Sequence, residues 1–387
     1  MIVEIIFLLV GIIFCCIYVY LWVLAVAGLL PEKRQVKTNG PLTKFGIVIP
    51  AHNESQLLPN TLARLSEVDY PKELYEVIVV ADNCDDDTAA IARKAKVTCW
   101  ERHDEEHTGK GFVLQWAFNK LPTYGDHGAY LVIDADTLLE PDFLQVLNLR
   151  LVNNAKAVQG YSDVINPERS PMESLSYLGF VLNRNLRYRG RTKLGWTSNL
   201  MGTGMCFSRE VIEEHGWIAT SIVEDVEYGM FLHLHDVRVE FAPEARLWVQ
   251  LHDTFKDTKG QRRRWDLGKF AVRNKYLPKL FRKGLRTGDL SYFDSSLELL
   301  IPPFTLFFVL TFFCYGVYLA SSQTDILFLR YLWHGTVSLA SLYVLTGLLY
   351  ARAGFKVYLS LLYVPFFLIW RFWIVIQGSL AKKHDKW

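Results

Sequence analysis

Residues 5–30, IIFLLVGIIFCCIYVYLWVLAVAGLL, form an apolar run that contains no charged side chain. As an α-helix rising 1.5 Å per residue, this run would extend about 39 Å, enough to cross a hydrocarbon core of about 30 Å. A cleaved signal peptide is the alternative interpretation, but the run is too long and lacks a basic segment before it. We therefore predict an N-terminal transmembrane helix within residues 1–32.

The flank that follows this run, PEKRQVK at residues 31–37, carries three positive charges and one negative charge. The positive-inside rule then predicts that the middle of the chain is cytoplasmic and that Met1 lies outside. The formal net charge of the whole chain is only +2, which predicts no nucleic-acid partner. The six cysteines show neither CxxC spacing nor a Cys/His cluster, so we interpret them as structural rather than as zinc ligands.

Three further apolar stretches follow in the C-terminal region, which we delimit as residues 296–387. The stretches at about 299–320 and 326–350 predict two membrane spans. The third, about 355–380, contains Pro365 and Arg371, and an arginine in the middle of a span is costly. We favour an interfacial or re-entrant segment there over a full span, and both interpretations stay open.

Residues 42–255 alternate short buried-strand patterns with helical patterns. The strand patterns are FGIVIP (45–50), YEVIVVA (75–81) and AYLVID (129–134). The helical patterns between them cover residues 54–66, 87–95 and 109–121. This alternation predicts an α/β domain with a mostly parallel, Rossmann-like sheet whose faces are both covered by helices. Neither a GxGxxG fingerprint nor a P-loop is present in the sequence.

Polar residues follow each predicted strand, at the carboxyl edge where such sheets bind ligands. The first strand is followed by His52, Asn53 and Glu54, and the second by Asp82. After the third, DADT places Asp134 and Asp136 on one side of the chain. Hard carboxylate oxygens suit Mg²⁺ or Mn²⁺, although aspartates at this point also occur in ordinary turns. Asp85, Asp86 and Asp87 stand where a helix begins, and we interpret them as caps.

Two further motifs carry candidate chemistry. SIVEDVEYG places Glu224 next to Asp225, which point in different directions on a helix, so one could react while the other anchors the segment. The alternative is a solvated helix face. In GKG, Lys110 lies between two glycines that permit close approach, which favours a phosphate contact. That motif and the glycines of LMGTGMCF (200–207) could also be simple turns.

The motif QRRRW lies in residues 256–295, a region in which apolar and basic residues alternate as in amphipathic helices at a membrane surface. Gln261, Arg264 and Trp265 share one helix face, where arginine suits a diphosphate and tryptophan offers a flat stacking surface. Arg262 and Arg263 point elsewhere, and we assign them to anionic lipid headgroups.

In order, the chain contains VIPAHNE, ADN, DADT, VED and QRRRW, with apolar segments on both sides. This ordered set resembles the family-2 membrane glycosyltransferases, which include synthases of cellulose, hyaluronan, chitin oligomers and poly-N-acetylglucosamine and the ceramide glucosyltransferases. The resemblance covers roughly residues 42–270 by motif. It departs from the family pattern at Val223, where a threonine is usual before the acidic pair.

The resemblance implies a GT-A fold, a nucleotide-sugar donor that is usually UDP-linked, and Mg²⁺ or Mn²⁺. It further implies a role for each matching motif residue. Asp225 would be the general base beside Glu224, Asp136 would bind the metal, and Glu54 and Asp82 would contact the uridine. The other implied substrate contacts are Pro50, Lys110, Asp134, Gln261, Arg264 and Trp265.

The expected reaction is an inverting sugar transfer, because direct attack on an α-linked donor gives a β-linked product. The number of predicted spans favours a lipid or lipid-linked glycan acceptor at the cytoplasmic face of the cell membrane. A processive polysaccharide synthase that extends and secretes a polymer is the first alternative. The second, a membrane scaffold or transporter with a degenerate transferase domain, is disfavoured because the acidic set is intact.

Overall fold

The structure is a computed structural model that describes residues 2–31, 41–249, 255–321 and 326–364, with residues 255–267 described by their backbone only. The described chain forms two compact units. The first contains the described parts of Met1–Glu32, Asn166–Gly195 and Leu300–Leu380, and the second contains those of Lys33–Ile165 and Trp196–Leu299. We call them the helical unit and the sheet unit and describe each by itself.

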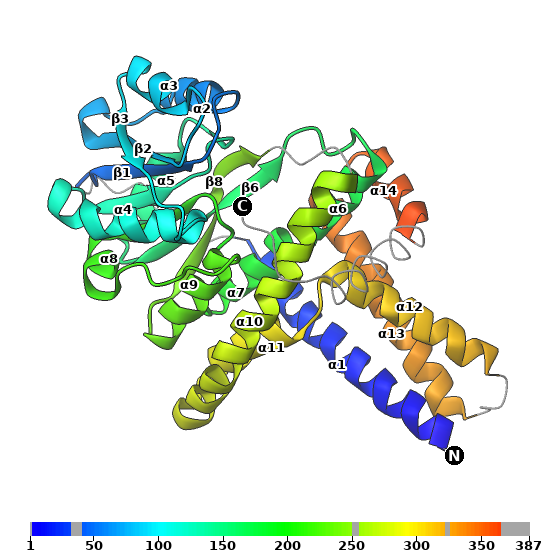
Figure 1. Ribbon diagram of the computed structural model, residues 1–387. Coiled ribbons are helices and arrows are strands. Elements are labelled where there is room, and N and C mark those ends of the chain that lie inside the picture. Colours follow the sequence, from blue (N-terminus) through cyan, green and yellow to red (C-terminus); the bar gives the residue numbers. More distant parts are fainter. Residues whose placement is uncertain (1, 32–40, 250–254, 322–325, 365–387) are drawn as a thin grey trace. The chain divides into compact units, whose positions relative to one another are not determined.

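The sheet unit is built on eight strands in the order β3-β2-β1-β4-β7-β6-β8-β5. Strands β1, β2, β3, β6 and β8 are labelled in Figure 1. Their bounds are β1 Phe45–Ala51, β2 Tyr75–Asp82, β3 Thr98–Arg102, β4 Ala129–Val132, β5 Leu138–Leu139, β6 Ala157–Val164, β7 Met205–Ser208 and β8 Val239–Val249. The three strands predicted from buried apolar runs are β1, β2 and β4. The remaining strands are shorter or carry polar residues, so their patterns were too weak for a prediction.

The sheet is mostly parallel, as predicted, with two strands that run against the rest. Strands β3, β2, β1 and β4 are parallel neighbours, as the βα alternation predicts. Strand β7 runs antiparallel between β4 and β6, β6 and β8 pair in parallel, and β5 runs antiparallel to β8. The parallel prediction therefore holds for six of the eight strands, and the reversed directions of β7 and β5 were not predicted.

Helices cover both faces of this sheet. Those of the sheet unit are α2 Leu58–Ser66, η1 Lys72–Leu74, α3 Thr88–Lys94, α4 Lys110–Tyr124, α5 Phe143–Val152, α8 Arg209–His215, α9 Glu224–Leu234, α10 Phe255–Thr287 and α11 Leu290–Leu300. Alternate residues of β1 enter different cores: Ile47 and Ile49 pack with α2 and α5, and Val48 packs with α4, α8 and α9. Burial on both faces explains why these strands are continuously apolar.

The helical unit contains the most apolar helices of the chain. Its elements are α1 Ile2–Leu29, α6 Pro171–Val181, the π-helix η2 Leu182–Tyr188, α7 Arg189–Lys193, α12 Phe304–Ala320, α13 Leu327–Tyr350, α14 Phe355–Ser360 and η3 Leu361–Tyr363. By length and composition, α1 and α13 are long and apolar enough to cross a membrane, and α11 with α12 would add a third span if they form one broken span. Of the predicted stretch 355–380, residues beyond 364 lie outside the described part of the chain.

Residues 166–195 belong to the helical unit, although the sequence places them between strands of the α/β domain. Here η2 and α7 pack against α1 at two glycines. A Cβ added at Gly28 would lie 2.7 Å from the carbonyl oxygen of Leu186, and one at Gly190 would lie 2.1 Å from that of Leu24. Both distances are far below contact range, so these helix backbones touch directly at glycine positions.

Replacement of Gly190 by alanine is expected to separate α1 from α7 and to destabilise the helical unit, because the clash is with backbone atoms that cannot rotate away. We expect a loss on the order of 2 kcal/mol, measured as a lower thermal unfolding midpoint of the full chain in detergent. The matched control is Gly179→Ala in α6, where an added Cβ meets nothing within 4 Å. Equal midpoints for the two variants would contradict the close packing.

Candidate functional site

The carboxyl ends of β1 and β2 are followed by two loops that hold each other in place. The Glu54 N–H donates to Thr88 Oγ1 at 2.8 Å, and the Ser55 N–H donates to Asp86 Oδ2 at 3.0 Å. In return, the Asp85 N–H donates to the side chain of Asn53 at 2.9 Å. Asn53 adopts a left-handed backbone with φ of 56°, a conformation that asparagine tolerates well. These hydrogen bonds link the loop after β1 to the loop after β2 at the predicted polar edge of the sheet.

Lys110 is the centre of the candidate site. It is the first residue of α4 and follows Gly109, whose φ of 114° allows the chain to turn sharply into the helix. The Lys110 ammonium bonds to Asp134 Oδ1, donates to the carbonyl oxygen of Gly202 at 2.9 Å, and lies 3.8 Å from Glu224 Oε1. The motifs GKG, DADT, SIVEDVEYG and LMGTGMCF therefore all contribute residues to the surroundings of the Lys110 ammonium.

Electrostatics in this cluster are set by burial. Burial raises the pKa of Glu224, although nearby Lys110 opposes the shift, and the neighbouring carboxylate of Asp225 adds to it. Burial likewise raises the pKa of Asp225, against a hydrogen bond from the Val226 N–H and the charge of Lys110. Burial disfavours the charged form of Lys110, but Asp134 and Glu224 outweigh it and raise the pKa of Lys110. The ammonium therefore stays charged among carboxylates of raised proton affinity.

The loop before β7 completes the cluster and was interpreted only as a candidate turn. Gly202 has a φ of +80°, and a Cβ there would lie 3.6 Å from Lys110 Nζ and 3.7 Å from Asp225 Oδ2. Gln159, fully buried in β6, accepts from the Met201 N–H at 2.9 Å and donates to the Thr203 carbonyl at 2.8 Å. The sequence analysis did not single out Gln159, and it noted Gly202 only among glycines that could form a turn.

A second acidic group forms around Glu54. Burial, together with the nearby carboxylates of Asp136, Asp134 and Asp86, raises the pKa of Glu54 to about 7. Carboxylates crowded in this way favour a hard divalent cation, so the donor chemistry fits Mg²⁺ or Mn²⁺. Among the described residues, however, no three His, Cys, Asp or Glu side chains are placed to hold a metal ion.

The raised pKa of Glu54 predicts a pH-dependent stability. Because the folded-state pKa of about 7 exceeds the ordinary value of 4.5, the folded chain binds more protons between these two values. The contribution of Glu54 to stability is therefore fully present below about pH 4.5 and is lost as pH rises towards 7. Glu54→Gln should remove this decline in the unfolding midpoint, and added Mg²⁺ should reduce it in the wild type. A wild-type profile parallel to that of Glu54→Gln would contradict the assignment.

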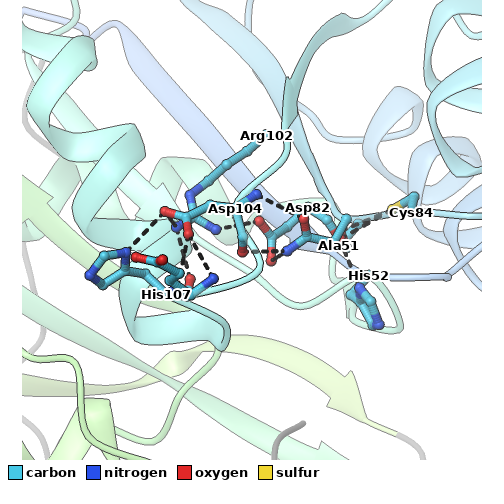
Figure 2. Close-up of polar contacts among 9 residues, drawn as sticks. Ala51, His52, Asp82, Cys84, Arg102, Asp104 and His107 are labelled. Atoms are coloured by element: carbon cyan, nitrogen blue, oxygen red, sulfur yellow. Dashed lines mark hydrogen bonds and ion pairs between the residues drawn. The ribbon is translucent and has the colours of Figure 1, made fainter.

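Asp82 lies in a separate network at the end of β2 (Figure 2). Its carboxylate is fully buried and accepts from Arg102 Nη1 at 2.5 Å and from Asn83 Nδ2 at 3.3 Å. Arg102, at the end of β3, also donates to Asp104 and to the His107 carbonyl, each at 2.8 Å. His52 Nδ1 contacts the Asp82 carbonyl at 2.7 Å, which joins this network to the loop of Glu54. The sequence analysis did not single out Arg102.

The predicted caps at 85–87 need a correction. Asp87 occupies the N-cap of α3 but makes no side-chain capping hydrogen bond. Asp86 provides this contact, because its carboxylate accepts from the N–H groups of Thr88 and Ser55. Desolvation opposes ionisation of Asp86, but these hydrogen bonds outweigh it and hold its pKa well below the ordinary value. Pro50, a predicted substrate contact, is buried inside β1.

The motif QRRRW lies on α10, close to the acidic pair. The side chains of Gln261, Arg264 and Trp265 lie outside the described part of the chain, so their predicted roles stay predictions. Three residues after Trp265, Gly268 packs against Val223, and a Cβ at Gly268 would lie 2.9 Å from that side chain. Val223 directly precedes Glu224, so the helix that carries the motif contacts the start of α9.

Comparison with known proteins places these features in context. The family described as "Glycosyltransferase like family 2" matches residues 41–268. The chain is 29% identical over 252 residues to the probable glycosyltransferase YdaM of Bacillus subtilis, covering 62% of this chain and 59% of that protein. It is 23% identical over 298 residues to a poly-β-1,6-N-acetyl-D-glucosamine synthase of Staphylococcus epidermidis, covering 74% and 68%. The chain therefore spans about three-fifths of the length of the Bacillus relative.

Among solved structures, the chain resembles the mannosyltransferase PcManGT from Pyrobaculum calidifontis, in complex with GDP-Man and Mn²⁺. The TM-score is 0.56 at 17% sequence identity, over 89% of this chain and 96% of that one. At this identity the likeness concerns the fold alone. It confirms the Rossmann-like, GT-A-like α/β architecture that the sequence analysis predicted.

Proposed function

The chain belongs to the glycosyltransferase-like family 2, and we propose that it moves a sugar, with inversion, from a nucleotide-sugar to a lipid or lipid-linked glycan. The donor we propose is a UDP-sugar, and the site is the cytoplasmic face of the cell membrane. The two helices of membrane-spanning length and apolarity, α1 and α13, support the membrane location. The three positive charges at 31–37 support a cytoplasmic catalytic unit.

One observation carries the proposal of sugar transfer: Lys110, Asp134, Glu224 and the loop at Gly202 converge on one point at the carboxyl edge of the sheet. Sugar transfer from a nucleotide needs a base for the acceptor and positive charge for the departing diphosphate. The cluster offers carboxylates of raised pKa beside a permanently charged lysine.

On the donor side, we propose that the loops after β1 and β2 hold the nucleoside. Asp82, oriented by Arg102, would accept from the base, and Glu54 would contact the uridine. Pro50 would border this position from β1, and Asp134 would stay near the nucleotide through its bond to Lys110. Asp136 would hold Mg²⁺ or Mn²⁺ beside Glu54, and the bound metal would supply positive charge to the diphosphate. The Mn²⁺ of the Pyrobaculum protein agrees with this choice.

On the acceptor side, we propose Asp225 as the general base. Asp225 is only half-buried, whereas Glu224 is 8% exposed and lies beside Lys110. The more accessible carboxylate can reach an acceptor hydroxyl, and Glu224 would hold Lys110 in place. Asp225 would take the hydroxyl proton as that oxygen attacks the anomeric carbon and the bond to the nucleotide breaks. Gln261, Arg264 and Trp265 would close over the diphosphate and the acceptor.

The experiment is a panel of UDP-sugars and GDP-sugars given to the purified full chain with Mg²⁺ or Mn²⁺ and extracted membrane lipids. Release of the nucleoside diphosphate identifies the donor, and mass spectrometry of the lipid fraction identifies the product. We expect release with one UDP-sugar and a lipid that gains one or a few sugars. No release with any donor, from protein shown to be folded, would overturn the proposal.

A processive polysaccharide synthase is the second candidate, and the match to the poly-β-1,6-N-acetyl-D-glucosamine synthase favours it. The two candidates share the donor site and differ in what the acceptor becomes. The length of the product separates them: a ladder of long chains indicates processive synthesis, and a discrete glycolipid indicates limited addition. UDP-N-acetylglucosamine is the first donor to test for this alternative.

A further inference from the structure

Glu227 is an acid of the motif SIVEDVEYG that the proposed reaction does not use. It stands in the first turn of α9, after Glu224 and Asp225, and is 5% exposed. Its two carboxylate oxygens have different partners. The Ser221 N–H donates to Oε2 at 3.2 Å, and Lys275 Nζ donates to Oε1 at 2.6 Å. A carboxylate that is this buried and has a partner at each oxygen is placed to support its surroundings, not to touch a substrate.

The contact with Ser221 holds the loop that leads into α9. Val223 occupies the N-cap of this helix, and its hydrocarbon side chain makes no capping hydrogen bond. Glu227 reaches back past the helix start to the backbone N–H of Ser221, much as the glutamate of a capping box does. The segment on which the acidic pair begins is therefore fastened by Glu227.

The contact with Lys275 joins α9 to α10, the helix that carries QRRRW. The hydrogen bond to Glu227 raises the pKa of Lys275, so the lysine stays charged. Val272, one turn before Lys275, packs in the same apolar core as Val223, so the two helices are in contact here. Eleven positions separate Arg264 from Lys275, about three helical turns, so helical periodicity puts both positions on the same side of α10. We call the contacts of Glu227 with Ser221 and Lys275 the Glu227 link.

The first turn of α9 is held by a lysine from each of two other helices. Glu224 and Glu227 are three positions apart and are therefore neighbours on the helix surface. Glu224 lies 3.8 Å from Lys110 of α4, and Glu227 pairs with Lys275 of α10. Asp225, which stands between the two glutamates in the sequence, is only half-buried. The two glutamates thus fix the turn from which Asp225 would face the acceptor.

We propose that Glu227 is a positioning residue for sugar transfer, and that the Glu227 link sets the separation between Asp225 on α9 and the QRRRW motif on α10. This inference deepens the proposed function and rests on it. Transfer needs the acceptor oxygen within about 3 to 3.5 Å of the anomeric carbon, and a displacement of about 1 Å can lower a rate by about 100-fold. A residue that touches no substrate therefore controls turnover when it holds the base and the diphosphate side in register.

The first test is the turnover of Glu227→Gln, measured as release of UDP by the full chain with the UDP-sugar that the donor panel selects. Glutamine has nearly the shape of glutamate but only one acceptor oxygen, so it can keep the contact with Ser221 or with Lys275 but not both. We expect the turnover number to fall by about tenfold. Lys275→Met should lower it in the same way, and Lys275→Arg, which keeps a cation, should restore it to within about threefold of wild type.

The matched control is Lys283→Met, which breaks another ion pair between the same two helices. Lys283 of α10 pairs with Asp236, just after α9, at 2.7 Å and donates to the carbonyl oxygen of Leu234 at 2.8 Å. These contacts lie at the end of α9 away from the acidic pair. We expect Lys283→Met to lower the thermal unfolding midpoint as much as Lys275→Met does and to leave turnover unchanged. Equal turnover in Lys275→Met and Lys283→Met, or wild-type turnover in Glu227→Gln, would overturn the proposal, because a purely structural ion pair affects turnover only through stability.

The second test measures the Glu227 link without donor or acceptor, as amide hydrogen exchange of the full chain over residues 219–226. We expect exchange of this segment to be at least about fivefold faster in Glu227→Gln than in the wild type, because the N–H of Ser221 loses a fixed acceptor. Exchange in Lys283→Met should match the wild type. Unchanged exchange in Glu227→Gln would overturn the inference, whereas absence of transfer by the folded wild type would overturn the proposed function, so the two failures are distinguishable.

Discussion

Asp225→Asn is expected to lower the rate of sugar transfer by about 10³-fold while the fold stays intact. An asparagine has nearly the same shape as aspartate, and its side-chain oxygen can still accept from the Val226 N–H, which lies 2.7 Å from Asp225 Oδ1. It cannot take the proton of an acceptor hydroxyl. The measurement is the turnover number for release of the nucleoside diphosphate at saturating donor and acceptor.

Two companion variants make this result specific. Glu213→Gln removes an exposed carboxylate from α8, where it pairs with Arg209, and should leave turnover unchanged. Glu224→Gln removes the buried neighbour and should lower turnover less than Asp225→Asn does, because we assign Glu224 to holding Lys110. If Glu224→Gln is the more damaging variant, the roles of the two acids are reversed. Normal turnover in Asp225→Asn would remove the residue from the catalytic site.

The closeness of Glu54, Asp134 and Asp136 was predictable from the sequence, because each follows directly on a strand that its buried apolar run identifies. Buried runs marked β1, β2 and β4, and parallel strands place their carboxyl ends at a common edge. Glu54, Asp134 and Asp136 follow such ends and interact electrostatically in the structure, as expected. Lys110 was predicted to contact phosphate. In the structure its partners are Asp134 and Glu224, so the phosphate contact stays a prediction.

Residues that support the site through distant contacts were not predictable in the same way. Gln159 is polar and fully buried in β6, and nothing in its neighbouring sequence indicates that it fastens a loop more than forty positions away. Arg102 ends a strand in a run of charged residues, a pattern typical of a surface, although it is 5% exposed and paired with Asp82. A single sequence gives no signal for such pairs, because they depend on the tertiary fold.

The helical insertion at 166–195 shows the same limit. Its π-helix contains NRNLRY, whose arginines suggest an exposed polar helix, yet Arg187 is buried and donates to Asn183 at 2.8 Å. The neighbouring Arg191, also buried, donates to the hydroxyl of Tyr20 in α1 at 3.2 Å. Propensity and charge pattern describe only what a segment prefers alone. Here contacts with α1 outweigh that preference.

Lys110→Met is expected to weaken both the fold and the reaction. The lysine side chain is only 19% exposed, and its removal would leave Asp134 and Glu224 close together without their shared cation. Removal of one partner from a fully buried ion pair costs about 3 to 5 kcal/mol, but Asp134 is 38% exposed and screened by water, so we expect a cost of about 2 kcal/mol and a thermal unfolding midpoint lower by about 5 °C. The matched control is Lys120→Met in the same helix, where the lysine is exposed and its loss should have little effect.

A double-mutant cycle separates this mechanism from a simple loss of packing. If the cost of Lys110→Met comes from uncompensated carboxylates, adding Glu224→Gln should recover at least about 1 kcal/mol of it. The pH profile gives a second readout: without the lysine charge the pKa of Asp225 should rise further, so the acidic limb of turnover should move to higher pH. If the stability losses of Lys110→Met and Glu224→Gln add up in the double variant, and the acidic limb of turnover does not move, then Lys110 does not compensate the negative charges of this site.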